Sequence, residues 1–383
     1  MEHIYHSKNF HDAACLIDTH RSLPVTYITS TNTWDLSPVI DWINGFKNNT
    51  IHQYTIVNAA TVAVEQIDPE AILVFGWEMM NACMLYNSYS KRDKFINQII
   101  TVHRGPVVVI KQDEHLYNPV LVDFVKRIEG KLSAILTCTS SDKDAERVYG
   151  GVDTKYIHIL PGYLPAVDTS KSKDFKDRSI DVLSRGRWLK PKYGELGRLK
   201  ASIGEEMLLY WNRNPEVQHL NINHSNDARD RIYGAWIPTV KEAKTLLATP
   251  TGCNVIHSTR SQLDIMRDGT TYSSYQRVYA AEINNWEDTL NFECISPKIL
   301  QAINCRTALI LYEGIYGDGV SNLVPGKHYI ELKRDNSNIA EVWEKVQDLD
   351  LIERITNRAF KYATTTYAYD RFVRFIDCIY SGL

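Results

Sequence analysis

A short segment in the last third of the chain combines residue types that could bind a phosphorylated sugar. Ser296 followed by Pro297 predicts a helix start, because serine is favoured at the N-cap and proline at the first helical position. The first turn would direct unpaired N–H groups and the positive end of the helix dipole at an anion, and Lys298 adds a full charge there. Glu293 stands just before this helix, and Gln301 shares a helical face with Lys298. These groups could bind hydroxyls and a diphosphate; the alternative is a capped structural helix with solvated Lys298 and Gln301.

A second group of cations follows a strand that we expect near residues 180–183. The loop after this strand places a glycine among basic side chains: Arg185, Gly186, Arg187, Lys190 and Lys192. Ligands of open α/β sheets bind at the carboxyl ends of strands, and arginine can bind a phosphate through two N–H groups. The loop therefore predicts a phosphate contact, with a solvated basic loop as the alternative.

In the first half of the chain, a strand expected near residues 107–110 ends in ionisable residues. Asp113 or Glu114 could deprotonate an acceptor hydroxyl, a task that burial assists by raising the pKa of a carboxyl group. The alternative is a surface turn. Residues 139–141, at another expected strand end, are a lesser candidate of the same kind.

Several motifs of metal and nucleotide chemistry are missing from the sequence. It contains no GxxxxGK[ST] phosphate loop, no GxSxG nucleophile elbow, no HExxH zinc motif and no acidic pair at a plausible strand end. We therefore expect no metal and no cofactor, with a nucleotide sugar as substrate. His328 is expected to fix a loop rather than to catalyse a reaction.

Short apolar runs alternate with helical patterns along the chain. The runs are mostly apolar rather than alternating, as in strands buried on both faces of a parallel sheet. Apolar residues at three- and four-residue steps predict helices at 196–210 and 339–346, the second with a capping box of Asn338 and Glu341. This alternation predicts an α/β fold. Strands are expected near residues 25–28, 55–57, 71–75, 107–110, 134–137, 156–160, 180–183, 219–222, 245–248 and 308–311.

The alternation is interrupted at residues 161–178, where prolines and basic residues predict a linker. We expect one Rossmann-like domain at 1–160 and a second at 179–365. The last segment, 366–383, places apolar residues on one helical face. It is expected to be a helix.

The basic loop and a later segment resemble parts of GT-B glycosyltransferases, particularly the bacterial family-4-like and CgeB-like groups. Gly186-Arg187 with Lys192 is similar to their glycine turn for the donor diphosphate. Residues 323–330, LVPGKHYI, resemble a stretch found downstream in such enzymes.

The segment with Glu293 resembles the E-x7-E element of the same enzymes, which lies beside the donor sugar and ribose. Glu293 and Gln301 stand at its spacing, and residues 296–298 are similar to an SP[RK] variant. The resemblance implies two Rossmann-like domains with parallel sheets facing across a cleft, and sugar transfer with retention of anomeric configuration. It also implies that 1–160 is the acceptor-side domain, that 179–365 binds the nucleotide sugar, and that the helix at 366–383 packs back on the first domain. Gln301 replaces the second glutamate, and an amide supplies no charge to the ribose contact.

Composition sets expectations about partners and location. The 383 residues include 43 Lys and Arg against 46 Asp and Glu, a net charge of −3, from which we expect no nucleic-acid partner. No apolar run has the length of a membrane helix, the start lacks a secretory signal, and the 7 cysteines never form CxxC. We therefore expect a cytoplasmic protein, with peripheral contact at the inner membrane face if its acceptor is lipid-linked.

The function that the sequence predicts is transfer of a sugar from a nucleotide sugar to a glycan or lipid-linked acceptor in surface polysaccharide synthesis. Two alternatives stay open. A sugar-nucleotide epimerase of similar shape would use similar phosphate contacts. A catalytically degenerate module would bind a nucleotide sugar without turnover, an interpretation that Gln301 favours.

Overall fold

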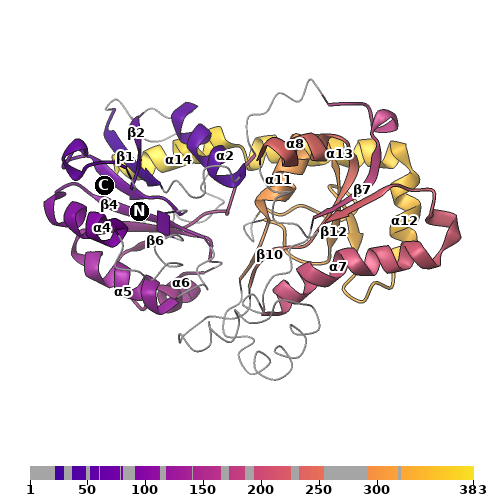
Figure 1. Cartoon of the computed structure of the whole chain (residues 1–383), viewed down its shortest axis with the longest axis horizontal. Helices are drawn as coiled ribbons and strands as arrows, with labels where there is room; N and C mark the ends of the chain where they lie inside the picture. The colour runs from indigo at the N-terminus through magenta and orange to yellow at the C-terminus, as the bar shows by residue number, and fades with distance from the viewer. Residues whose placement is uncertain are drawn as a thin grey trace. The chain divides into compact units, whose positions relative to one another are not determined.

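The chain divides into two units, each built on its own parallel sheet. Unit 1 contains the described residues up to Leu160 together with the C-terminal segment from Tyr369, and unit 2 contains those from Pro161 to Ala368 (Figure 1). The computed structural model describes residues 22–29, 37–48, 52–59, 61–77, 79–80, 91–112, 118–139, 141–164, 172–185, 194–225, 233–253, 292–317 and 321–383.

Unit 1 is built on a parallel sheet of six strands in the order β2-β1-β3-β4-β5-β6. Helices α2 and α14 lie over one face and α4, α5 and α6 over the other (Figure 1), as right-handed crossovers require. The strands are β1 (Pro24–Thr29), β2 (Gln53–Asn58), β3 (Ile72–Phe75), β4 (Val107–Lys111), β5 (Leu132–Thr137) and β6 (Lys155–His158). The helices are α2 (Ser37–Asn48), α4 (Lys91–Val102), α5 (Asn118–Ile128), α6 (Asp142–Tyr149) and α14 (Tyr369–Ser381), with short 3-10 helices at Val64–Gln66 and Glu129–Lys131.

The C-terminal helix α14 belongs to unit 1 because aromatic side chains join it to α2. The Trp42 and Phe372 rings meet edge to face at 5.1 Å between centroids. The Tyr369 ring lies against Gly45, where an added Cβ would come within 2.6 Å of the ring. The close approach of the two helices therefore depends on the missing side chain at Gly45.

Unit 2 is built on a parallel sheet of five strands in the order β13-β12-β9-β7-β8, with a separate antiparallel pair, β10 and β11. The strands are β7 (Ile180–Arg185), β8 (Ile222–Ser225), β9 (Ala243–Ala248), β10 (Thr251–Cys253), β11 (Phe292–Cys294), β12 (Ala308–Tyr312) and β13 (Ile330–Leu332). The helices are α7 (Gly194–Arg213), α8 (Tyr233–Lys241), α11 (Pro297–Asn304), α12 (Ile339–Gln347) and α13 (Leu349–Thr366), with 3-10 helices at Phe175–Asp177 and Pro215–Val217.

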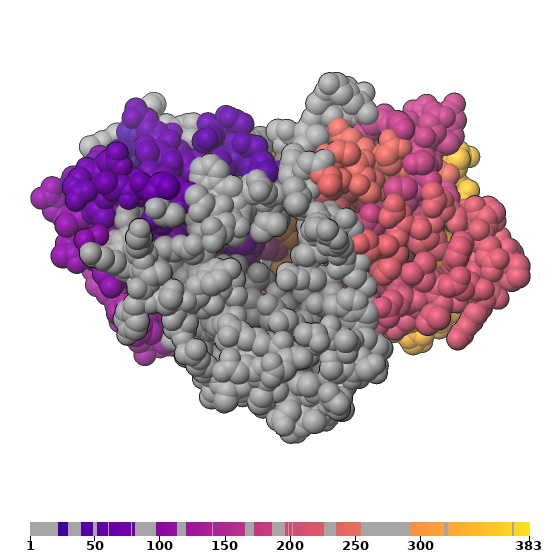
Figure 2. Space-filling view, viewed as in Figure 1, coloured from indigo at the N-terminus to yellow at the C-terminus, as the bar shows by residue number. Residues whose placement is uncertain are grey.

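The core of unit 2 joins α7 and α12 to the sheet. Ile203 and Met207 of α7 pack in one buried cluster with Trp343 of α12 and Ile310 of β12. The opposite side of α7 forms part of the surface of the unit, as Figure 2 shows. Apolar side chains at three- and four-residue steps thus produce the amphipathic helix that the sequence predicts.

The predicted α/β fold with two parallel sheets is confirmed. One predicted strand is misplaced, because residues 219–222 precede the strand that begins at Ile222. The predicted capping box of α12 is wrong: Asn338 is the N-cap residue, but its side chain accepts from Lys333 N and donates to Glu331 O. At the end of the segment expected as a linker, the buried Arg178 donates to Ala243 O at 2.8 Å within unit 2. None of the helices among the described residues has the length and apolar character of a membrane span.

In each sheet, successive strands are added first on one side of the starting strand and then on the other, so the strand order has one switch point. In unit 1 the chain continues from β1 to β2 on one side and to β3 on the other. In unit 2 it continues from β7 to β8 on one side and to β9 on the other. Ligands of open α/β sheets bind outside the carboxyl ends of the strands at such a switch point, so each unit presents one place for a ligand.

His328 fixes the loop between β12 and β13, as predicted. Its Nδ1 accepts a hydrogen bond from Val324 N at 3.0 Å, and its ring stacks on Tyr362 at 4.7 Å between centroids. Burial, with further contributions from the Lys327 and Arg358 cations, lowers the pKa of His328 from 6.5 to about 4. An unprotonated Nδ1 is the form that can accept the Val324 N–H.

We expect the titration of His328 to lower the free energy of unfolding by about 2 kcal/mol between pH 7 and pH 5. As the pH falls through 6.5 the unfolded chain binds a proton that the folded imidazole takes up only near pH 4, so the unfolded state gains stability across that window. The measurement is urea unfolding at both pH values for the wild type and for His328→Phe, which keeps an aromatic ring but does not titrate. An equal pH dependence in both proteins would contradict the assignment.

Candidate functional site

The switch point of the unit 2 sheet brings together the two basic segments that the sequence singles out. Lys298, in the first turn of α11, donates from Nζ to Arg185 O at 3.1 Å, at the end of β7. The Arg185 guanidinium donates to Asn223 O at 2.9 Å and to Asn223 Oδ1 at 2.7 Å, which ties β7 to β8. Segments more than a hundred residues apart in the sequence thus meet at one sheet edge.

The predicted start of α11 is confirmed, although its capping is not. Ser296 is the N-cap residue and Pro297 opens the helix, but the Ser296 side chain forms no capping hydrogen bond. Pro297 lies against Gly162, where an added Cβ would come within 2.9 Å of the proline ring. The amino end of α11 is therefore positioned by backbone contact, and its first N–H groups receive no cap from the serine hydroxyl.

Glu293, on β11, is held in one orientation by the loop after β12. Its Oε1 accepts from Ile315 N at 2.8 Å, and its Oε2 lies 3.5 Å from an Arg334 guanidinium nitrogen. The carboxylate side chain is 15% exposed. An added Cβ on Gly314 would stand 2.3 Å from Glu293 Oε1, so a glycine is needed for the loop to come this close. The arrangement fixes a partly accessible carboxylate beside the switch point.

Two cationic residues of this edge, Arg334 and Lys200, are not among the site residues that the sequence predicts. Arg334 follows β13 and donates through Nε to Glu313 O at 3.1 Å. Lys200 of α7 donates to Thr251 Oγ1 of β10 at 3.1 Å. The signal for Arg334 is its place just after a strand, but β13 has only 3 residues and was not predicted.

A buried hydroxyl and a half-buried imidazole also lie at this edge. Thr249, just after β9, is 2% exposed and its Oγ1 has no hydrogen-bond partner. His224 of β8 lies 3.1 Å from Ser184 Oγ through Nδ1. Burial, and then the Arg185 cation, lowers the pKa of His224, which favours its neutral form.

Gln301 occupies the interior rather than the surface of α11. It is 1% exposed, and its Oε1 accepts from Trp236 Nε1 of α8 at 2.7 Å. The interpretation of Gln301 as a solvated residue is therefore wrong, and the ribose contact implied by the resemblance stays a prediction for a side chain that is bound to Trp236 in this structure. The other predicted site residues lie outside the described residues, and they are Gly186, Arg187, Lys190, Lys192, Asp113 and Glu114.

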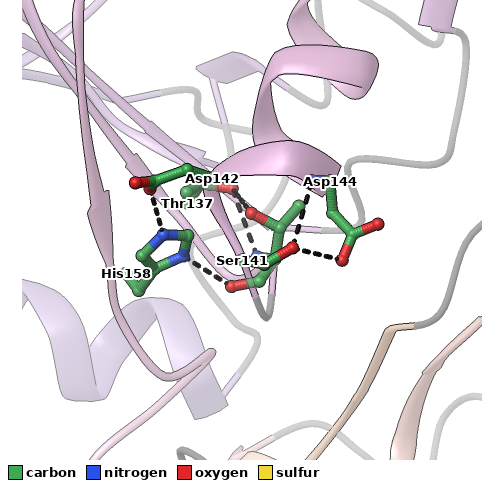
Figure 3. A network of polar contacts seen from close by, with 6 residues as sticks. Thr137, Ser141, Asp142, Asp144 and His158 are labelled. Atoms are coloured by element: carbon green, nitrogen blue, oxygen red, sulfur yellow. Dashed lines mark hydrogen bonds and ion pairs between the residues drawn. The ribbon is translucent and has the colours of Figure 1, made fainter. Parts of the chain in front are cut away.

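At the far end of the unit 1 sheet, Thr139 and Ser141 belong to a polar network, part of which Figure 3 shows, whereas Ser140 lies outside the described residues. His158, at the end of β6, lies 2.7 Å from Thr139 O through Nδ1 and 2.8 Å from Asp142 Oδ1 through Nε2. Ser141 caps α6 by accepting from Asp144 N, and its hydroxyl donates to Asp144 Oδ2 at 2.8 Å. These contacts join β5, β6 and α6, which gives the network a structural role.

The described part of the chain holds no group of three or more His, Cys, Asp or Glu residues arranged for a metal ion. At the unit 2 edge the positive charges come instead from Arg185, Lys298, Arg334 and Lys200. Such an edge can bind an anion through side chains and the start of α11, and hydroxyl groups through Glu293.

Solved structures share the fold of this chain. An alpha-glucosyltransferase in complex with UDP and a 13-mer DNA containing a HMU base matches it with a TM-score of 0.57 and 10% sequence identity, over 94% of this chain and 100% of that chain. The Anabaena protein Alr3699/HepE in complex with UDP matches with a TM-score of 0.51 and 10% identity, again over 94% and 100%. No family model and no curated protein matches the sequence. The predicted GT-B fold is confirmed, and the more specific resemblance to the family-4-like or CgeB-like groups stays a prediction.

The comparison also corrects one expectation about partners. The absence of a nucleic-acid partner was predicted from a net charge of −3. That inference is wrong, since an alpha-glucosyltransferase of the same fold is bound to UDP together with DNA. Net charge describes the whole chain, whereas contact with a nucleic acid depends on the local distribution of charge.

Proposed function

We propose that this protein is a glycosyltransferase that moves a sugar from a UDP-sugar to a hydroxyl group of an acceptor. The observation that carries the proposal is the meeting, at one sheet edge of unit 2, of a fixed carboxylate and cations from separate segments. Glu293 is held beside Arg334, and Lys298 is held against the end of β7. The choice of uridine diphosphate is supported by the solved structures of the same fold that contain UDP.

In the proposed reaction the bond from the anomeric carbon to the diphosphate oxygen breaks, and its electron pair leaves on the diphosphate. A bond forms from the acceptor oxygen to the anomeric carbon, and the hydroxyl proton passes to a base. Lys298, through its ammonium group and its backbone N–H at the start of α11, would stabilise the departing charge in a reaction without a metal ion. Glu293 would accept hydrogen bonds from the sugar hydroxyls. We propose retention of the anomeric configuration, as the resemblance to GT-B enzymes implies.

Two acceptor classes are consistent with this chemistry. A glycan or lipid-linked glycan follows from the sequence resemblance and would bring the protein to the cytoplasmic face of a membrane. A base in DNA is favoured by one specific observation, the alpha-glucosyltransferase complex with a HMU base. A sugar hydroxyl and the hydroxymethyl group of a modified base are both alcohols, so one donor site would serve either acceptor.

The proposal predicts that UDP and UDP-glucose raise the melting temperature of the protein. Binding to the native state raises stability in proportion to the logarithm of ligand concentration over Kd. The measurement is a thermal-shift screen of UDP, GDP, CMP, ADP and dTDP sugars, each at several concentrations. A shift with none of them would contradict the donor site, and a shift with another base alone would contradict the choice of UDP.

Product analysis separates the proposal from the two alternatives. A transferase releases UDP and forms a glycoside, or slowly hydrolyses the donor when water takes the place of the acceptor. An epimerase would change the sugar without an acceptor. A binding module would show the thermal shift without any product.

A further inference from the structure

Three buried polar groups gather at the carboxyl edge of the unit 1 sheet. They are Thr29 Oγ1, Trp77 Nε1 and Gln112 Oε1, and none of them has a hydrogen-bond partner. Thr29 is 0% exposed, Trp77 6% and Gln112 9%. A buried polar group without a partner destabilises a fold, and most buried groups in proteins are paired. Three together at strand ends call for an explanation.

Strand register brings the three groups to the same edge. Ile28 of β1 pairs with Phe75 of β3, and Phe75 pairs with Val109 of β4. Thr29, Trp77 and Gln112 follow these paired residues by one, two and three positions, at the ends of three adjacent strands. The edge includes the β1–β3 boundary, which is the switch point of this sheet.

The other end of the same sheet provides an internal comparison. At the ends of β5 and β6, Thr137 Oγ1 lies 3.1 Å from Thr139 Oγ1 and His158 contacts Thr139 O and Asp142 (Figure 3). The polar groups drawn there satisfy one another. Unit 1 also has buried groups without a partner away from the switch point, among them both ring nitrogens of His103, whereas Thr29, Trp77 and Gln112 follow the ends of three adjacent strands.

We propose that Thr29, Trp77 and Gln112 form a binding site for a carbohydrate hydroxyl, and that this hydroxyl belongs to the acceptor. The identification as an acceptor depends on the proposed function. The indole N–H of Trp77 can only donate, the Gln112 oxygen can only accept, and the Thr29 hydroxyl can do either.

A sugar hydroxyl matches this set because it accepts one hydrogen bond and donates another. A phosphate or carboxylate only accepts, and would leave the Gln112 oxygen unsatisfied. The cation described at these strand ends, Lys111, is 0% exposed and donates from Nζ to Gln112 O. The described edge thus presents uncharged groups, which suits a neutral glycan.

The test is Thr29→Val, with Thr137→Val as its matched control. Both changes replace a buried threonine hydroxyl in the same sheet by a methyl group of similar shape. Removing a hydroxyl that has no partner should raise the melting temperature by about 2–4 °C, and removing the bonded hydroxyl of Thr137 should lower it by a similar amount.

Ligand binding is measured by titration calorimetry with octyl β-D-glucoside in the presence of UDP. We expect saturable binding to the wild type and to Thr137→Val, and at least tenfold weaker binding to Thr29→Val and Trp77→Phe. The gain in stability together with the loss of binding is the result that a structural threonine would not produce. A 13-mer DNA with a HMU base is titrated in parallel.

Two results for Thr29→Val would overturn the inference: a lower melting temperature, which would show a structural partner such as water, or unchanged glucoside binding. Two results for the wild type would do the same: no binding of the glucoside, or binding of the DNA in place of the glucoside. The thermal shift of the wild type with UDP is recorded separately, so that failure of the donor site is distinguished from failure of this site.

Discussion

Replacing Glu293 by glutamine is expected to lower the rate of sugar transfer, or of UDP-glucose hydrolysis, by about 10²–10³-fold. The amide oxygen can still accept from Ile315 N, so the loop after β12 should keep its position. The negative charge beside Arg334 is lost, and with it the strongest acceptor for the donor sugar hydroxyls. UDP, which lacks the sugar, should still raise the melting temperature. The measurement is the steady-state rate together with the UDP thermal shift.

A second variant, Gly314→Ala, displaces the Glu293 carboxylate without changing its chemistry. In Gly314→Ala the new Cβ would stand 2.3 Å from Glu293 Oε1 and 2.5 Å from Pro250 Cγ, so the carboxylate must move. We expect a loss of turnover close to that of Glu293→Gln, and no further loss when the two changes are combined. Glu341→Gln, on the exposed side of α12, is the control for loss of an acidic charge. Full activity of Glu293→Gln would remove Glu293 from the mechanism.

The sequence was informative about the fold wherever a strand is buried on both faces. β3 and β4 are buried along their whole length, and their uninterrupted apolar runs made them recognisable. β8 is half-buried at every position, so no apolar run marks it, and its predicted place was three residues too early. β10, β11 and β13 have 3 residues each, too few to show a period.

The candidate site was predictable only in part, for a physical reason. Lys298 and Glu293 flank a helix start that local sequence encodes, so their neighbourhood could be inferred. Arg334 reaches Glu293 through tertiary folding across 41 positions, which no local pattern records. Gln301 shows the converse case, since its spacing fits a known element while its side chain is bound by Trp236. Spacing specifies a helical face, but packing decides whether that face meets a ligand.

Near-neutral charge was likewise a poor guide to partners. The same total of −3 is compatible with a cationic edge in unit 2 and an uncharged edge in unit 1. If the donor is held by cations and the acceptor by neutral hydrogen-bonding groups, each edge fits a different half of the transfer reaction. Salt would then weaken donor binding more than acceptor binding.

Lys298→Met is expected to weaken UDP binding by about 1.5–3 kcal/mol, or roughly 10–150-fold in Kd. An ammonium group in the first turn of α11 adds its charge to the helix N-terminus, where a diphosphate would be bound. In this structure the ammonium also donates to Arg185 O, so a purely structural lysine would lower the melting temperature without changing the UDP-induced shift. Lys298→Arg should keep most of the shift, because it restores the charge and the donors.

Lys345→Met, an exposed lysine of α12 paired with Glu341, is the control for loss of a cation from unit 2. A donor-binding lysine and a structural one are distinguished by two quantities, the melting temperature without ligand and its increase with UDP. If Lys298→Met changes the melting temperature without ligand and leaves the UDP-induced increase as in the wild type, the helix start is a structural feature, and the donor binds at another strand end. If the UDP-induced increase falls and Lys298→Arg restores it, the charge at the start of α11 binds the diphosphate.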